Sequence, residues 1–155
     1  VIELAGSFDT TIGTSSFQAD IAAETRSNDT HAYRAGVKVT AGGITAGGSV
    51  FKRKDNDADN TATATDLNAN SYDLGVSYAM GAYTFGISTA VGTVDVGAGI
   101  EDKESKWQAG MSYAIDTGVT GTLTYIRADY TDGNSGAAAN NNDGHALIGQ
   151  IKVSF

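Results

Sequence analysis

Apolar and polar residues alternate along most of this chain, in segments of about ten residues joined by polar or glycine-rich connections. In Ser71–Met80, for example, the tyrosine, leucine, valine and methionine side chains fall at even numbers, and polar or small residues fall at odd numbers. A period of two predicts β-strands with one apolar and one polar face. We expect nine such strands: Val1–Phe8, Ser16–Arg26, Ala32–Ala41, Ile44–Arg53, Ser71–Met80, Tyr83–Val94, Glu104–Ile115, Val119–Tyr130 and His145–Phe155.

The connections between these segments alternate between short and long. The short ones are Gly42-Gly43, Gly81-Ala82 and Asp116–Gly118, with a less regular member at Asp9–Ser15. The long ones are Asp55–Asn70, Asp95–Lys103 and Thr131–Gly144, with a shorter member at Ser27–His31. Short turns at one end of a sheet and long polar loops at the other are typical of outer-membrane barrels, whose strands need about ten residues to cross a bilayer.

Composition and charge narrow the possible functions. The 155 residues include 20 glycines, no proline and no cysteine, and the net charge is −8. The charge argues against nucleic acid as a partner, and the lack of cysteine excludes disulfides and thiolate metal sites. No apolar run approaches the ~20 residues of a membrane-spanning helix. The sequence starts without an initiator Met or a signal peptide, so we expect a processed or truncated product.

Aromatic residues on the apolar face gather near the ends of the expected strands. Two such bands are typical of the aromatic girdles that lie at the two bilayer interfaces. One band, near the long connections, contains Tyr33, Tyr72, Trp107 and Tyr125. The other, near the short turns, contains Tyr78, Tyr83, Tyr113 and Phe155. The polar face is rich in Gly, Ser and Thr, which suits a surface in contact with water.

Two features resemble known bacterial outer-membrane proteins. The last segment alternates Leu147, Ile151 and Val153 and closes on Phe155, which is similar to the signal read by the barrel-assembly machinery. The runs Ser71–Ser88 and Trp107–Asp116 look like those of Gram-negative general porins, particularly alphaproteobacterial ones. The resemblance covers most of the chain.

This resemblance implies an all-β fold, an antiparallel transmembrane β-barrel of sixteen strands that is usually trimeric and is narrowed by an inward-folded loop. Residues 1–155 supply about half that number of strands. The first and last segments would run in the same direction, so an antiparallel barrel needs further strands between them. We therefore expect a porin segment whose N-terminal strands, with the constriction loop, are missing.

The implied function is passive diffusion of small hydrophilic solutes and ions through a water-filled pore of the bacterial outer membrane, in contact with lipid and lipopolysaccharide, without cofactor or metal. The charges expected to line the pore are Glu3, Asp20, Glu24, Arg26, Arg34, Lys38, Asp73, Lys106 and Lys152. Rings of such side chains set ion preference. Arg26, Arg34 and Lys38 lie on adjacent strands and are expected either to form one basic wall or simply to solvate a wet lumen.

Other interpretations remain open. Ser16–Phe155 could form a small eight-stranded barrel, with Val1–Phe8 as a tail, that acts as an anchor or adhesin. Asp143 with His145 suggests a catalytic dyad, but no nucleophile motif accompanies it, so we expect no enzyme. Asp55, Asp57 and Asp59 lack the Gly and Glu of a calcium loop, which leaves a weak divalent site or a plain solvated loop. Arg127, on the apolar face, could reach a lipid phosphate.

Overall fold

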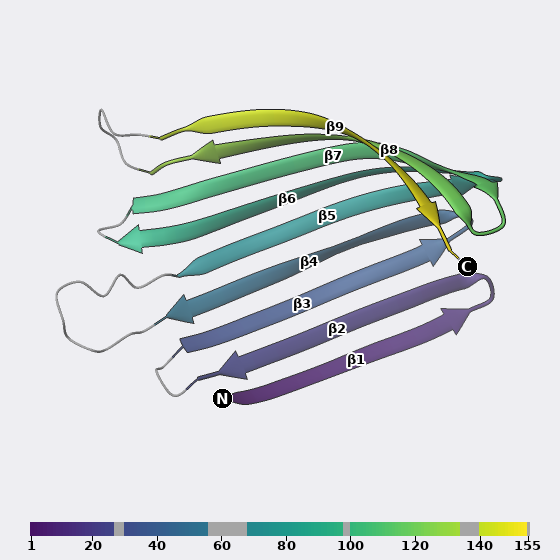
Figure 1. Ribbon diagram of the computed structural model, residues 1–155. Coiled ribbons are helices and arrows are strands. Elements are labelled where there is room, and N and C mark those ends of the chain that lie inside the picture. Colours follow the sequence, from purple (N-terminus) through teal and green to yellow (C-terminus); the bar gives the residue numbers. More distant parts are fainter. Residues whose placement is uncertain (27–29, 56–67, 98–99, 134–139, 155) are drawn as a thin grey trace.

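Nine antiparallel strands form a single sheet in sequence order (Figure 1). The computed structural model describes residues 1–26, 30–55, 68–97, 100–133 and 140–154. The strands are β1 (Ile2–Ile12), β2 (Ser15–Thr25), β3 (Thr30–Ala41), β4 (Ile44–Asp55), β5 (Ala69–Met80), β6 (Tyr83–Gly97), β7 (Ile100–Asp116), β8 (Val119–Thr131) and β9 (Asn142–Val153). The predicted all-β, antiparallel fold is confirmed.

Tight turns join the strands at one end of the sheet, and the longer connections lie at the other end (Figure 1). Gly13, Gly43, Gly81 and Gly118 take positive φ angles of 61°, 82°, 61° and 76° in these turns. Glycine has no Cβ to oppose this left-handed conformation, so these residues allow the chain to reverse within a few residues.

Two expected connections are shorter than the sequence pattern indicated. The first turn is Gly13-Thr14 alone, because β1 continues to Ile12 through polar residues that do not alternate. The expected loop Asp95–Lys103 is mostly strand, since β6 runs to Gly97 and β7 starts at Ile100, with a register shift between Asp95 and Gly97. Pairing therefore extends beyond the apolar segments, because backbone hydrogen bonds do not require apolar side chains.

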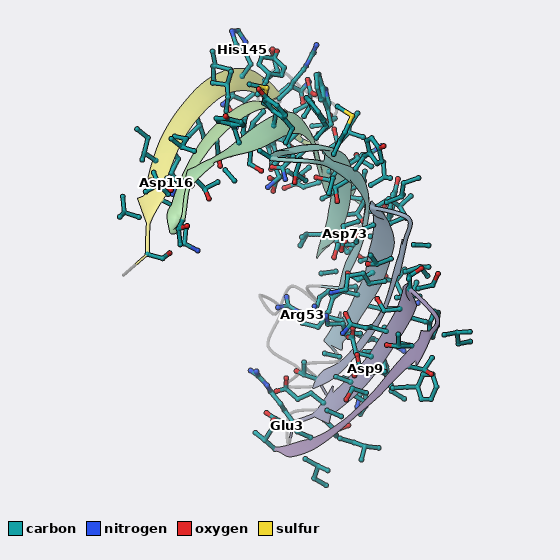
Figure 2. The ribbon with its side chains drawn as sticks, turned by 90° about the vertical axis from the view of Figure 1, so that its right-hand side faces the viewer. Glu3, Asp9, Arg53, Asp73, Asp116 and His145 are labelled. Carbon is teal, nitrogen blue, oxygen red and sulfur yellow. The ribbon has the colours of Figure 1, made fainter. Side chains whose placement is uncertain are left out.

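The sheet is strongly curved, and its two faces differ in chemistry (Figure 2). Arg53 points into the hollow of the concave face, whereas His145 lies on the convex face. Nearly all of the exposed large apolar side chains have the convex parity, and none of the described apolar residues is buried. No helix among the described residues is long and apolar enough to cross a membrane. The apolar surface of this sheet thus faces outward, the reverse of a soluble domain.

The two edge strands run in the same direction. β1 ends at the short-turn end of the sheet, and so does β9 (Figure 1). Every described pairing joins a strand to its neighbour in sequence, and none joins β1 or β2 to β9. The described sheet is therefore an open arc with two unpaired edges.

Candidate functional site

The concave face is built mainly from small and polar residues. Cross-strand register aligns Thr40, Thr45, Ser77, Gly86 and Gly110 in one row across β3 to β7. These side chains project little from the sheet, so the face leaves a hollow of about 830 Å³ between β2 and β8. A surface of glycines and hydroxyls cannot exclude water, and it offers hydrogen bonds to solvent along its length.

A second row, four residues along each strand toward the long connections, carries charge. It runs from Asp20 on β2 through Gly36 and Ser49 to Asp73 on β5, and then through Ala90 to Lys106 on β7. The Ser49 hydroxyl donates a hydrogen bond to the Asp73 carboxylate. The Asp20 carboxylate lies above Gly36, where a Cβ would come within 2.8 Å of its Oδ1. Asp20 on β2 and Asp73 on β5 therefore lie on either side of β3 and β4, and the basic residue Lys106 follows on β7.

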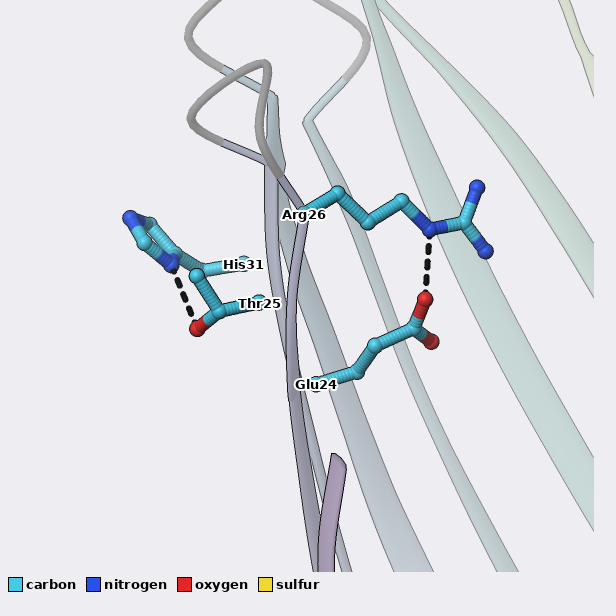
Figure 3. A network of polar contacts seen from close by, with 4 residues as sticks. All are labelled: Glu24, Thr25, Arg26 and His31. Atoms are coloured by element: carbon cyan, nitrogen blue, oxygen red, sulfur yellow. Dashed lines mark hydrogen bonds and ion pairs between the residues drawn. The ribbon is translucent and has the colours of Figure 1, made fainter. Parts of the chain in front are cut away.

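The predicted pore-lining charges share the concave parity. Glu3 is opposite Glu24, and Arg26 Nε lies 2.5 Å from Glu24 Oε1 on the same side of the ribbon (Figure 3). Lys152 continues this parity at the far edge, opposite Thr120. The structure brings these residues onto one face, while their contact with a water-filled pore remains a prediction.

The three bases of the expected basic wall are not equivalent in the structure. Arg26 forms an ion pair with Glu24, close to the end of β2. Arg34 and Lys38 are exposed on β3, and Asp20 of β2 lies between their register positions. The surface is thus a mixture of both signs, with Arg34 and Lys38 as its exposed central bases.

The sequence interpretation missed several groups on the same face. Arg53 projects into the hollow (Figure 2), and Phe51 is an aromatic residue on this polar parity, opposite Arg34. Asp102 and Glu104 also have concave parity, and Asp102 accepts hydrogen bonds from the Tyr130 hydroxyl at 2.7 Å and the Gly133 amide at 3.0 Å. Extending the alternation past the apolar part of each segment identifies Arg53 and Asp102.

The predicted girdle residues lie on the convex face where they are described. Near the short turns, the rings of Tyr83 and Tyr113 are 4.7 Å apart. Near the long connections, the rings of Trp107 and Tyr125 are 5.2 Å apart. Tyr33, Tyr72 and Tyr78 are also exposed on this face, whereas Phe155 lies outside the described residues.

The described histidines and Arg127 contact neighbouring side chains and do not form a catalytic or metal site with other described residues. His145 stacks on Tyr125 with ring centres 6.2 Å apart, and His31 Nδ1 is 3.1 Å from the Thr25 hydroxyl. Arg127 Nη2 lies 3.0 Å from Asp129 Oδ1. Within the described part of the chain, no group of three or more His, Asp or Glu residues is placed to hold a metal. Asp55, Asp57 and Asp59, interpreted from the sequence as either a weak divalent site or a plain solvated loop, lie outside the residues whose side chains are described.

Comparison with known proteins agrees with this geometry. The sequence matches the family described as Gram-negative porin over residues 2–144. No curated protein and no solved structure matches the chain. Members of a porin family form channels rather than enzymes, and they reside in the bacterial outer membrane. The match covers far more than half of the chain, and the chain belongs to the Gram-negative porin family.

Proposed function

We propose that this protein carries small hydrophilic solutes and ions down their gradients through a water-filled β-barrel. The observation that supports this proposal best is the concave face of glycine, serine and threonine, which has the opposite chemistry to the apolar convex face. A closed sheet with these faces places water inside and lipid outside. Because the polar side chains are short, the interior stays open to solutes.

We further propose that residues 1–155 form one part of a larger barrel. The edge strands β1 and β9 are parallel, so an antiparallel closure requires an odd number of additional strands between them. Seven would raise the nine described strands to sixteen, a number that leaves an aqueous channel. Three such barrels would associate as a homotrimer.

The charges of the concave face are proposed to set ion preference. Arg34 and Lys38 are exposed, and the described residues form no ion pair with either of them. They attract anions, whereas Asp20 and Asp73 oppose that effect from the neighbouring strands. Lipid and lipopolysaccharide would contact the convex face, and Phe155 would serve as the assembly signal.

The alternative is a small eight-stranded barrel that acts as an anchor or adhesin. That arrangement needs β9 to pair with β2, and the interior of so narrow a barrel is filled by side chains. Here β1 pairs with β2 along its whole length, and the small residues of the concave face would fill a narrow interior poorly. Both observations favour the larger pore.

Planar-bilayer recording of the purified native protein tests the proposal. We expect stable conductance steps, and the double variant Arg34→Gln/Lys38→Gln should move the reversal potential in a salt gradient toward cation preference. Lys52→Gln/Lys54→Gln is the matched control, since it also removes two positive charges, and both lysines have the convex parity of β4. Absence of conductance would contradict the pore, and an equal shift in the control would contradict the assignment of faces.

A further inference from the structure

One phenylalanine ring lies on the polar face of the sheet. Phe51 of β4 has concave parity, whereas the other described phenylalanines have convex parity. Tyr130 is also concave, but its hydroxyl donates a hydrogen bond to Asp102. Phe51 is half-buried, and within the described part of the chain its ring contacts no other ring. A ring that has no partner ring in the protein is available to stack on the ring of a solute.

Small residues lie beside this ring on the side of β5 and β6. The cross-strand neighbour of Phe51 on β5 is Ser71, and Gly92 of β6 continues the same row. Ser49, two residues before Phe51 on β4, donates its hydroxyl to the Asp73 carboxylate. Because these side chains are short, a planar solute can lie over this part of the row and contact the ring.

Two guanidinium groups flank the ring. Arg34 of β3 is directly opposite Phe51, which places their Cβ atoms about 5 Å apart. Arg53 is two residues further along β4 on the same face, roughly 7 Å away, and it projects into the hollow (Figure 2). Arg34 is exposed and forms no ion pair with the described residues. Asp20 and Asp73 lie in the neighbouring row, so the groups directly beside the ring are positive.

We propose that Phe51 and Arg34 form a subsite of the pore for planar aromatic carboxylates, with the solute ring stacked on Phe51 and its carboxylate bound by Arg34. The inference rests on the proposed function, because it needs water and solutes to reach the concave face. A guanidinium binds a carboxylate through two parallel hydrogen bonds, and an offset pair of rings gains more than its buried area alone. A neutral sugar would leave the charge of Arg34 without a partner, and an aliphatic acid would gain no ring contact.

Saturation-transfer NMR of the full-length native protein in alkyl maltoside micelles, titrated with benzoate and with cyclohexanecarboxylate, tests the subsite. The two anions have the same charge and nearly the same size, so the ratio of their dissociation constants isolates the aromatic contact. We expect benzoate to bind about two- to tenfold more tightly, the range of one aromatic pair. Phe51→Leu should bring this ratio close to one, and Phe51→Tyr should keep it because the ring is retained.

Two further variants separate the ring from the charge and the concave face from the convex face. Arg34→Gln should weaken the binding of both anions by a similar factor and leave their ratio unchanged, because it removes the partner of the carboxylate. Phe85→Leu is the matched control for the ring, since Phe85 is an exposed phenylalanine of the convex face. It should change the affinity for either anion less than twofold.

Three results would overturn the proposal. Equal affinity of the unsubstituted protein for the two anions would show that no aromatic contact forms. A preference for benzoate that survives Phe51→Leu would show that the ring only packs against Arg34. Loss of the preference in Phe85→Leu would place benzoate on the convex face. Conductance of the same preparations separates the two proposals: a protein that prefers benzoate and conducts nothing contradicts only the pore, and one that conducts but shows no preference contradicts only the subsite.

Discussion

An arginine at the middle of the convex face should destabilise this protein far more than the same residue one position along the strand. Ile87 is 54% exposed on β6. Tyr83, in the aromatic band near the short turns, lies four residues before Ile87. Val91 lies four residues after Ile87, opposite Tyr72 of the band near the long connections. Each interval is about 13 Å along the strand. Ile87 is thus midway between the two bands, at the level of the bilayer centre.

Arginine on the lipid face of a barrel at this level costs about 2–4 kcal/mol. We therefore expect Ile87→Arg to lower the free energy of unfolding by this amount, roughly a 30-fold or larger change in the folding equilibrium. Ser88→Arg is the control, since Ser88 lies on the concave face between Gly75 and Gln108. A water-filled interior hydrates the new charge, so its cost should stay below about 1 kcal/mol.

Urea unfolding of the native protein in lipid vesicles measures both variants. Trp107, on the convex face, reports the loss of the lipid environment by fluorescence. The reasoning is refuted if Ser88→Arg destabilises the protein as much as Ile87→Arg does, because the two faces would then meet the same environment.

Three further outcomes follow from individual contacts. Gly118→Ala should lower the unfolding free energy by about 1–3 kcal/mol in the same assay, because Gly118 has φ +76° and a Cβ there would clash with the Ser154 carbonyl oxygen. Tyr83→Ala should cost about 0.5–1.5 kcal/mol, since it removes the aromatic pair with Tyr113, whose ring lies 4.7 Å away, whereas Tyr83→Phe should keep most of the stability. Ser88→Trp should lower single-channel conductance without loss of folding, because an indole would fill part of the hollow.

The alternation of residue types was sufficient to predict the main features of the fold. Each segment expected to be a strand forms one, and the strands are antiparallel. The prediction succeeds because a strand with one apolar face has an apolar residue at every second position. The ends of strands were harder to place. Residues 9–11 of β1 are all polar, so β1 was expected to stop at Phe8, although its pairing continues to Ile12.

The candidate site was only partly visible in the sequence. The parity of Arg34, Lys38 and Asp73 follows from alternation, but the Asp20 carboxylate above Gly36 depends on which residues meet across strands. Hollows on the convex face could not be predicted for the same reason, since small residues such as Ala35 and Ala46 lie on neighbouring strands and come together only in the observed register.

Site-directed spin labelling of β5 tests the central claim most directly. The sequence contains no cysteine, so single cysteines at positions 71 to 78 can each carry one label in the membrane-embedded protein. We predict that labels at even positions, beginning with Tyr72, collide with oxygen dissolved in lipid, and that labels at odd positions, beginning with Ser71, collide with a water-soluble nickel chelate. Equal access of the nickel chelate to both sets of positions would contradict the account.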